Sequence, residues 1–150
     1  MGGGHCAKAI AEACNPLDWK YSVQDSRADY ATLDGATETH HSCPNDFLES
    51  ETQETLSRFS DILLLGHDWK EDEERLLGLL SKGYSGRLGV IGSKSKWKAF
   101  TSVALEAGIS QETLDGVNCP IGLAIGAESP EEIAIAVLAE ILAAYKGVNP

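Results

Sequence analysis

Cysteine pairs and long apolar runs are both absent from the sequence. Four cysteines are scattered over 150 residues with no Cys-x-x-Cys pair, which is typical of a reducing cytoplasm rather than of a disulfide framework or a zinc site. No apolar run approaches the ~18 residues that a membrane span needs, and no signal-peptide pattern is visible. We therefore expect a cytoplasmic protein without a membrane segment.

Positive charge is also scarce. Twelve Lys and Arg stand against 23 Asp and Glu, a formal net charge of −11, which argues against nucleic acid or an anionic membrane as a partner. Hydrophobic residues at 43% and charged residues at 23% are ordinary values for a globular protein. The length suffices to bury a core, so we expect a single domain over residues 1–150.

Short apolar runs alternate with helical patterns along the chain. Residues 62–65 and 88–91 have the composition of buried parallel strands. A further strand is expected over 19–24, ending at Asp25, with a short edge strand over 37–41. Helices are expected over residues 7–14, 49–57, 71–80, 96–107, 110–114 and from 130 onward. This alternation predicts an α/β fold, a Rossmann-like parallel sheet with helices on both faces.

The chain opens on glycines that have the spacing of a dinucleotide-binding fingerprint. In the pattern Gly2-x-Gly4-x-x-Ala7, the first glycine permits a tight turn, the second lets a phosphate approach the backbone, and the small third residue allows close packing. About twenty residues later, Asp25 could accept hydrogen bonds from a ribose hydroxyl. The alternative is a flexible Gly-rich start, with Asp25 and Arg27 as the polar end of a strand.

One part of the fingerprint has no counterpart. The glycines should follow a strand, yet only Met1 precedes Gly2, so we expect the first strand to be missing or truncated. A sheet without its central strand leaves unpaired ladder groups on two neighbours. Such a sheet could close through another chain, as in a homodimer, or by rearrangement.

Polar residues follow the two buried strands. His67 and Asp68 come directly after 62–65, at the strand end where ligands bind in open α/β sheets, although a structural role at the start of the next helix is an equal alternative. After 88–91, the turn Gly92-Ser93-Lys94-Ser95-Lys96 offers amides, hydroxyls and lysines as an anion cradle. His40, His41 and Cys43 lack a matching second half for a closed four-ligand site, so we expect a loop and no metal.

A Pro/Gly loop at 119–127 precedes the last helix. Ser129 can cap this helix, Pro130 suits its first position, and Glu132 can close a capping box. The helix is apolar nearly all round, as a buried helix should be, and the loop before it is expected to line a ligand site. Cys119 could contact a metal only as a thiolate; we expect a small buried hydrophobe and leave it outside the site.

Several stretches taken together resemble the Rossmann domain of the XdhC/CoxI accessory factors of xanthine dehydrogenase. They are Gly-Gly-Gly-His-Cys-Ala (2–7), Val-Gln-Asp-Ser-Arg (23–27), Gly-His-Asp (66–68), Leu-Gly-Val-Ile-Gly-Ser-Lys (88–94), and Cys-Pro-Ile-Gly (119–122) followed by Pro-Glu-Glu-Ile (130–133). The last two are the most specific. Asp25-Ser26-Arg27 stands where the family commonly has Asp-Asp-Arg.

The resemblance implies a function that the residues alone do not. Such factors bind the molybdenum cofactor (molybdopterin), support its sulfuration with a cysteine desulfurase, and deliver it to a xanthine dehydrogenase-type molybdenum hydroxylase. The residues that would form the cofactor site are Gly2, Gly4, His5, Asp25, Arg27, His67, Asp68, Gly92, Ser93, Lys94, Pro120 and Gly122. Two alternatives stay open, an NAD(P)-dependent oxidoreductase and a degenerate interaction module that has lost its ligand.

Overall fold

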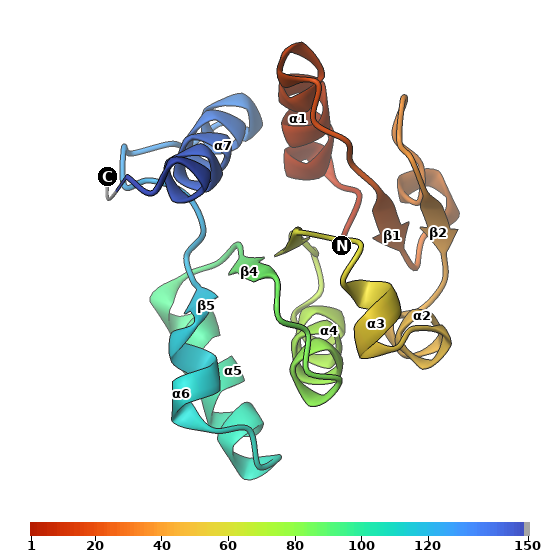
Figure 1. The fold of residues 1–150 in the computed structure, drawn as a ribbon, viewed down its shortest axis with the longest axis vertical. Coiled ribbons are helices and arrows are strands. Elements are labelled where there is room, and N and C mark those ends of the chain that lie inside the picture. Colours follow the sequence, from red (N-terminus) through yellow and green to blue (C-terminus); the bar gives the residue numbers. More distant parts are fainter. Residues whose placement is uncertain (149–150) are drawn as a thin grey trace.

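The computed structural model describes residues 1–148, and its strands form two parallel sheets that lie side by side (Figure 1). The smaller sheet pairs β1 (Val23–Asp25) with β2 (Thr39–His41). The larger sheet has the order β3 (Asp61–Leu64), β4 (Arg87–Val90), β5 (Val117–Asn118). All pairings are parallel, as the alternation of strands and helices predicts.

Met1 and Gly2 join the two sheets. The Met1 amino group donates to the Leu63 carbonyl over 2.5 Å, and the Leu65 amide donates to the Met1 carbonyl over 2.8 Å. On the other side, the Gly2 amide donates to the Gln24 carbonyl over 2.8 Å. The overall order is therefore β2-β1-(Met1–Gly2)-β3-β4-β5, the strand order of a doubly wound Rossmann fold. Within the described residues, Met1 and Gly2 stand at the place of the central strand of that fold.

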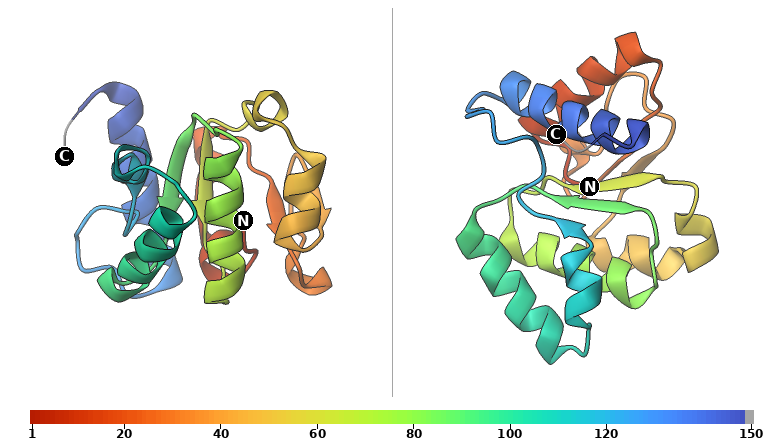
Figure 2. Two further views of the ribbon diagram at one scale, coloured as in Figure 1. Left: turned by 90° about the horizontal axis from the view of Figure 1, so that it is seen from below. Right: turned by 60° about the vertical axis from the view of Figure 1, so that its left-hand side comes forward.

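Helices cover both faces of this arrangement, as Figure 2 shows. One face carries α1 (His5–Cys14) and α7 (Pro130–Lys146), which pack against each other. The opposite face carries α2 (Pro44–Ser50), α3 (Gln53–Leu56), α4 (Trp69–Ser81), α5 (Lys94–Glu106) and α6 (Gln111–Asp115). Two single 3-10 turns, Asn15–Leu17 and Ala28–Tyr30, complete the elements. No helix within residues 1–148 has both the length and the apolar character to cross a membrane.

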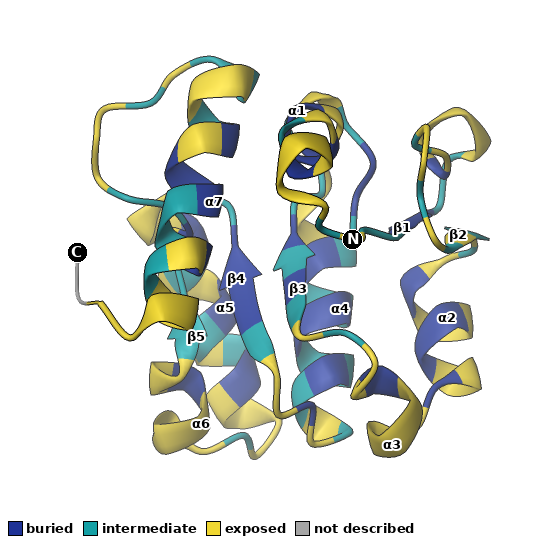
Figure 3. Cartoon of the chain, turned by 45° about the horizontal axis from the view of Figure 1, so that its top comes forward, coloured by how far each residue is buried: buried dark blue, intermediate teal, exposed yellow. Residues whose placement is uncertain are grey.

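The core has two parts because successive strand side chains point to opposite faces. Ile62 and Leu64 of β3 pack with the helices of the α4 face, whereas Leu63 and Leu65 pack on the α1 and α7 side. Figure 3 shows the buried residues on both sides of β3 and β4. A buried parallel sheet is apolar on both faces, and this explains why residues 62–65 form a continuous apolar run.

Three sequence predictions need correction. The single helix expected over 49–57 is two helices, because Pro44 begins α2 and Thr52 begins α3 with a capping box. The strand expected over 19–24 is shorter, because the regular parallel pairing with β2 begins only at Val23, although the Thr37 amide donates to the Tyr21 carbonyl over 2.8 Å.

The third correction concerns α7, which is not buried all round. Ala134, Val137 and Ile141 face the core, but Ile135 is 61% exposed and Leu142 is 40% exposed. One face of α7 packs on α1 and the sheet, and no element within residues 1–148 covers the other. Composition alone did not distinguish a helix covered on one side from one covered on all sides.

Candidate functional site

The candidate site lies at the carboxyl edge of the strands. In a parallel sheet all strands end at the same edge, and the helices that follow them begin there. Met1–Gly4 leads into α1, β3 leads through Gly66 into α4, and β4 leads through Gly92 into α5. The strand order reverses between β1 and β3, at the position of Met1 and Gly2, and ligands of such folds bind at this switch point.

The first two glycines of the opening turn allow close contact between backbones. Gly2 has a φ of +91°, and a Cβ added there would lie 2.7 Å from the Gly66 amide nitrogen. A Cβ at Gly3 would lie 1.7 Å from the Tyr30 carbonyl oxygen. Gly4 is different, since nothing lies within 4 Å of an added Cβ. Neighbouring backbone atoms therefore leave no room for a side chain at Gly2 and Gly3, whereas the space beside Gly4 is open.

The N-terminus of α1 keeps its amides available. Gly4 is the N-cap residue and offers no side chain to cap the helix, and the first helical hydrogen bond runs from Lys8 to Gly4 over 3.0 Å. The amides of His5, Cys6 and Ala7 have no protein acceptor within the described residues. Free amides and the positive end of the helix dipole favour an anion at this position.

Asp25 is held at the opposite side of the same turn. One carboxylate oxygen accepts from the Gly3 amide over 2.8 Å and from Arg27 Nη2 over 2.9 Å; the other accepts from the Arg27 amide and Nε, each over 2.9 Å. Burial by itself raises the pKa of Asp25, but the hydrogen bonds from Arg27 and Gly3 outweigh it and hold the pKa well below its usual range. A carboxylate offers about four acceptor positions, so a ribose hydroxyl would have to displace one of these donors.

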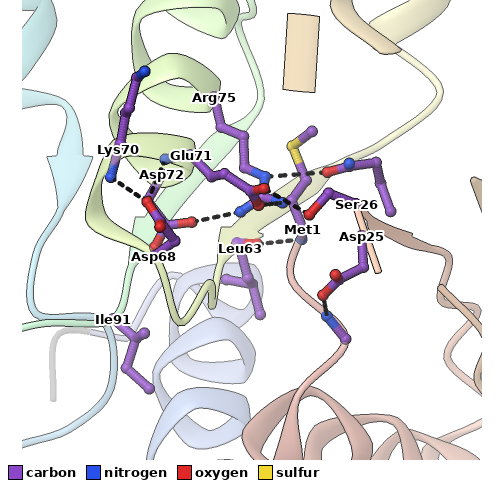
Figure 4. Close-up of polar contacts among 12 residues, drawn as sticks. Met1, Asp25, Ser26, Leu63, Asp68, Lys70, Glu71, Asp72, Arg75 and Ile91 are labelled. Carbon is purple, nitrogen blue, oxygen red and sulfur yellow. Dashed lines mark hydrogen bonds and ion pairs between the residues drawn. The ribbon is translucent and has the colours of Figure 1, made fainter. Parts of the chain in front are cut away.

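Asp68 begins α4 as its N-cap. Its carboxylate accepts from the Lys70 amide over 2.7 Å and from the Glu71 amide over 3.1 Å (Figure 4). These two bonds lower the pKa of Asp68. His67 is exposed beside it. The capping role at this helix start therefore belongs to Asp68, and His67 stays free at the carboxyl edge.

A buried polar network lies beneath these loops, and sequence analysis missed it. Arg75 is 1% exposed and donates to Asp72 over 2.9 Å, to Glu71 over 2.9 Å and to Gln24 over 3.1 Å. Ser26 donates to Glu71 over 2.6 Å. The network links α4 to Gln24 of β1 and to Ser26 in the loop that follows β1, as Figure 4 shows around Arg75. The sequence pattern that could have indicated this network is the pair Asp72 and Arg75, which are three residues apart and therefore lie on one face of a helix.

The turn after β4 is a helix start whose second lysine points inward. Ser93 caps α5 by accepting from the Lys96 amide over 3.2 Å. The Lys96 side chain is buried, and its ammonium donates to Asp72 over 2.8 Å and to the Ile91 carbonyl over 3.1 Å. Lys96 is therefore not part of an anion cradle, contrary to the sequence prediction. Lys94 is exposed at this edge.

The loop at 119–127 is tied to the sheet and to α7. The Ile121 amide donates to the Val90 carbonyl over 3.0 Å, and the Gly122 amide donates to Glu140 over 2.6 Å. Gly122 packs against the backbone of α7 and Pro120 is exposed. These bonds fix the position of the loop. Because the Gly122 amide donates to the Glu140 carboxylate, it is not available to a ligand.

Ser129 and Glu132 form the predicted capping box, with Pro130 in the first turn of α7. Cys119 is half-buried, and burial raises the pKa of its thiol to about 11. Burial thus disfavours the thiolate form of Cys119, which agrees with its interpretation as a small partly buried hydrophobe.

The residues around His40 have structural roles. His40 contacts Glu38 over 2.9 Å and meets the ring of Phe47 edge-on. The sulfur of Cys43 caps α2 by accepting from the Asp46 amide over 3.4 Å. Across residues 1–148 no three His, Cys, Asp or Glu side chains are grouped as metal ligands would be.

The structure thus brings together part of the predicted site. Gly2, Gly4 and His5 lie beside the Asp25–Arg27 pair, and the Gly66 turn contacts Gly2. The turn of Gly92, Ser93 and Lys94 joins the same edge through the buried pair of Lys96 and Asp72. Pro120 and Gly122 belong to the loop that α7 anchors.

The strand order and the glycine turn define a Rossmann domain. A family model described as the XdhC Rossmann domain matches residues 1–141, and the chain belongs to this family. Among curated proteins, the chain is 28% identical over 142 residues to "Uncharacterized protein YqeB" of Escherichia coli K12, covering 95% of this chain and 26% of that protein.

A solved structure with the same fold is a Bacillus halodurans protein described as a xanthine dehydrogenase. It matches 99% of this chain and 42% of its own length, with a TM-score of 0.79 and 24% identity. The chain therefore spans about a quarter of YqeB and less than half of the Bacillus protein.

Proposed function

We propose that this domain binds the molybdenum cofactor at the carboxyl edge of its sheet and acts as an accessory factor for a xanthine dehydrogenase-type molybdenum hydroxylase. Membership of the XdhC family supports the accessory role. With a cysteine desulfurase, the factor would assist sulfuration of the cofactor and its insertion into the enzyme. The name of the Bacillus halodurans neighbour is consistent with such an association.

The observation that carries the proposal is the start of α1. Its free amides follow a turn that is open at Gly4, and the phosphate of molybdopterin is an anion of the kind that helix N-termini bind. His67 and Lys94 are exposed on the neighbouring helix starts and would contact the polar edge of the pterin. The cofactor supplies the sulfur-accepting metal, whereas this chain would bind and orient it.

A dinucleotide would use the same amides for its pyrophosphate. The saturation of Asp25 by Gly3 and Arg27 weighs against it, because recognition of a ribose hydroxyl would cost a buried hydrogen bond. NAD and NADP therefore serve as comparison ligands in the test below.

The test measures binding of molybdopterin released from a molybdoenzyme, by retention of pterin fluorescence on the protein after ultrafiltration. Gly4→Asp places a carboxylate where the phosphate would bind, in a position free of neighbours, and we expect at least about tenfold weaker binding, or about 1.4 kcal/mol. Ser110→Asp is the matched control, because it adds the same charge at the N-cap of α6, which precedes β5 and lies toward the amino edge.

Equal binding by the wild-type protein and the Gly4→Asp variant would contradict the proposed site. No binding of molybdopterin, together with a thermal shift in NAD or NADP, would replace the proposal by a dinucleotide-binding function. At about 100 times its dissociation constant a ligand adds about 2.7 kcal/mol of stability, which a thermal shift detects.

A further inference from the structure

Helix α7 leaves one of its faces uncovered by any element of the described chain. Along that face lie Glu131, Ile135, Leu142 and Lys146, all of them exposed. Their spacing of four, seven and four residues keeps them in one stripe, because an α-helix turns once in 3.6 residues. This α7 stripe is acidic at the start of the helix, apolar along its middle and basic at its end.

The charged ends of the α7 stripe are not used by the chain itself. Neither Glu131 nor Lys146 forms an ion pair or a side-chain hydrogen bond within residues 1–148. The other two carboxylates of α7, those of Glu132 and Glu140, are both bonded within the chain. The stripe therefore offers one charge of each sign, separated by two exposed apolar side chains.

A second copy of the chain supplies the complementary groups when its α7 lies antiparallel to the first. One twofold axis near the midpoint of α7 sets Ile135 opposite Leu142 of the second copy. The same axis sets Glu131 opposite Lys146 of the second copy, because the members of both pairs stand equally far from that midpoint. In such a dimer each contact occurs twice, so no charge of the stripe is left unpaired.

The opposite orientation does not satisfy the same groups. Two parallel α7 helices would set Glu131 against Glu131 and Lys146 against Lys146, and like charges across an interface oppose association. The helix dipoles also favour the antiparallel pair, since the positive start of one helix meets the negative end of the other. Ala139, which lies between Ile135 and Leu142 along the helix and is partly buried, has no bulk to hold the two helices apart.

We propose that the α7 stripe is the contact surface of a homodimer in which two α7 helices pack antiparallel about a twofold axis. The apolar side chains would supply most of the affinity and the ion pairs would set the direction, because exposed ion pairs contribute little affinity. One pair of helices buries less than the about 1,200–2,000 Å² of a stable interface. We therefore expect a weak dimer, with a dissociation constant of about 10–100 μM.

The dimer would leave both candidate sites open. Helix α7 follows the loop at 119–127 at the carboxyl edge and ends at the amino edge, where Tyr145 donates to Asp61 at the start of β3. Two antiparallel copies of α7 therefore place their carboxyl edges at opposite ends of the dimer.

The first experiment is sedimentation equilibrium of the 150-residue chain from about 5 to 500 μM, a range that spans the expected dissociation constant. Leu142→Ala and Leu105→Ala form a matched pair, because the two leucines lie on helices and are 40% and 44% exposed. We expect Leu142→Ala to weaken the dimer by at least about tenfold. Leu105→Ala, on α5, should leave the dissociation constant unchanged.

Charge reversal tests the orientation. Glu131→Lys and Lys146→Glu each set like charges across both pairs, so each variant alone should dimerise at least about tenfold more weakly. An equimolar mixture of the two variants restores opposite charges at both pairs, and it should associate within about threefold of the wild-type dissociation constant. Both positions are exposed, and circular dichroism checks that each variant keeps the fold.

Three outcomes would overturn the proposal. A monomer at every concentration would leave the α7 stripe to a different partner. The same dissociation constant for Leu142→Ala and the wild type would place the dimer contact on another surface. Single charge reversals without effect would indicate a parallel pair, in which one like-charge contact merely replaces another. None of these measurements depends on cofactor binding.

Discussion

In a chain that begins with a free amine at Met1, burial of this amine would make the stability of the fold depend on pH. Desolvation by burial, followed by the nearby charge of Arg75, lowers its pKa from 8.0 to about 5, although Asp72 and Asp25 act in the opposite direction. Between these two values the unfolded chain binds a proton at this amine and the folded chain does not. Stability is therefore fully present above pH 8, and it is lost as the pH falls toward 5.

The magnitude follows from the two pKa values. The pKa of the amine differs by about three between the unfolded and the folded chain, from 8.0 to about 5. One pKa unit corresponds to about 1.4 kcal/mol, so the effect over the whole range is about 4 kcal/mol. Between pH 6 and pH 8 the change is about 2 kcal/mol. Such a change is a large part of the 5–15 kcal/mol that stabilises a typical domain.

The assay is urea unfolding at a series of pH values, on the chain with a free Met1 amine and on the same chain acetylated at Met1. Acetylation removes the titrating amine and leaves every other group, so the difference between the two curves isolates Met1. We expect the free chain to gain about 2 kcal/mol relative to the acetylated chain from pH 6 to pH 8. A difference that stays constant over this range would refute the reasoning, since it would mean that the amine is hydrated in the folded state.

Two further predictions test the glycine turn and the polar network. Gly3→Ala should cost about 3 kcal/mol or more, because its Cβ would meet the Tyr30 carbonyl at 1.7 Å; Gly4→Ala, with nothing within 4 Å, should change the unfolding free energy by about 0.5 kcal/mol or less. Arg75→Met leaves Asp72 with only Lys96 and should cost about 3–5 kcal/mol in urea unfolding. Adding Glu71→Gln to Arg75→Met should recover part of this loss by removing one unpaired charge, and equal stability of the single and double variants would contradict that account.

The fold could be predicted because its main determinants are local. Residues 62–65 and 88–91 are apolar on both faces, which only a covered parallel sheet explains. Ser129, Pro130 and Glu132 fix the start of the last helix by the chemistry of its first turn.

The candidate site was less predictable because its side chains are paired over long sequence separations. Nothing near Lys96 in the sequence shows that its ammonium turns inward to Asp72, 24 residues away. The same holds for Gln24 and Arg75, which meet across 51 residues. Asp25 was predicted as an acceptor for a ribose hydroxyl from its spacing after the glycines, but its saturation depends on the orientation of the Arg27 side chain, which spacing does not reveal.

The seam between the two half-sheets also bears on how the domain unfolds. Main-chain hydrogen bonds across it come from Met1 and Gly2, and side-chain bonds join Gln24 to Arg75 and Ser26 to Glu71. Both hydrophobic cores also span it, because α1 packs on α7 and Phe47 and Leu48 pack with Leu76 and Leu79. The two halves therefore share their buried apolar surface and are expected to unfold as one cooperative unit.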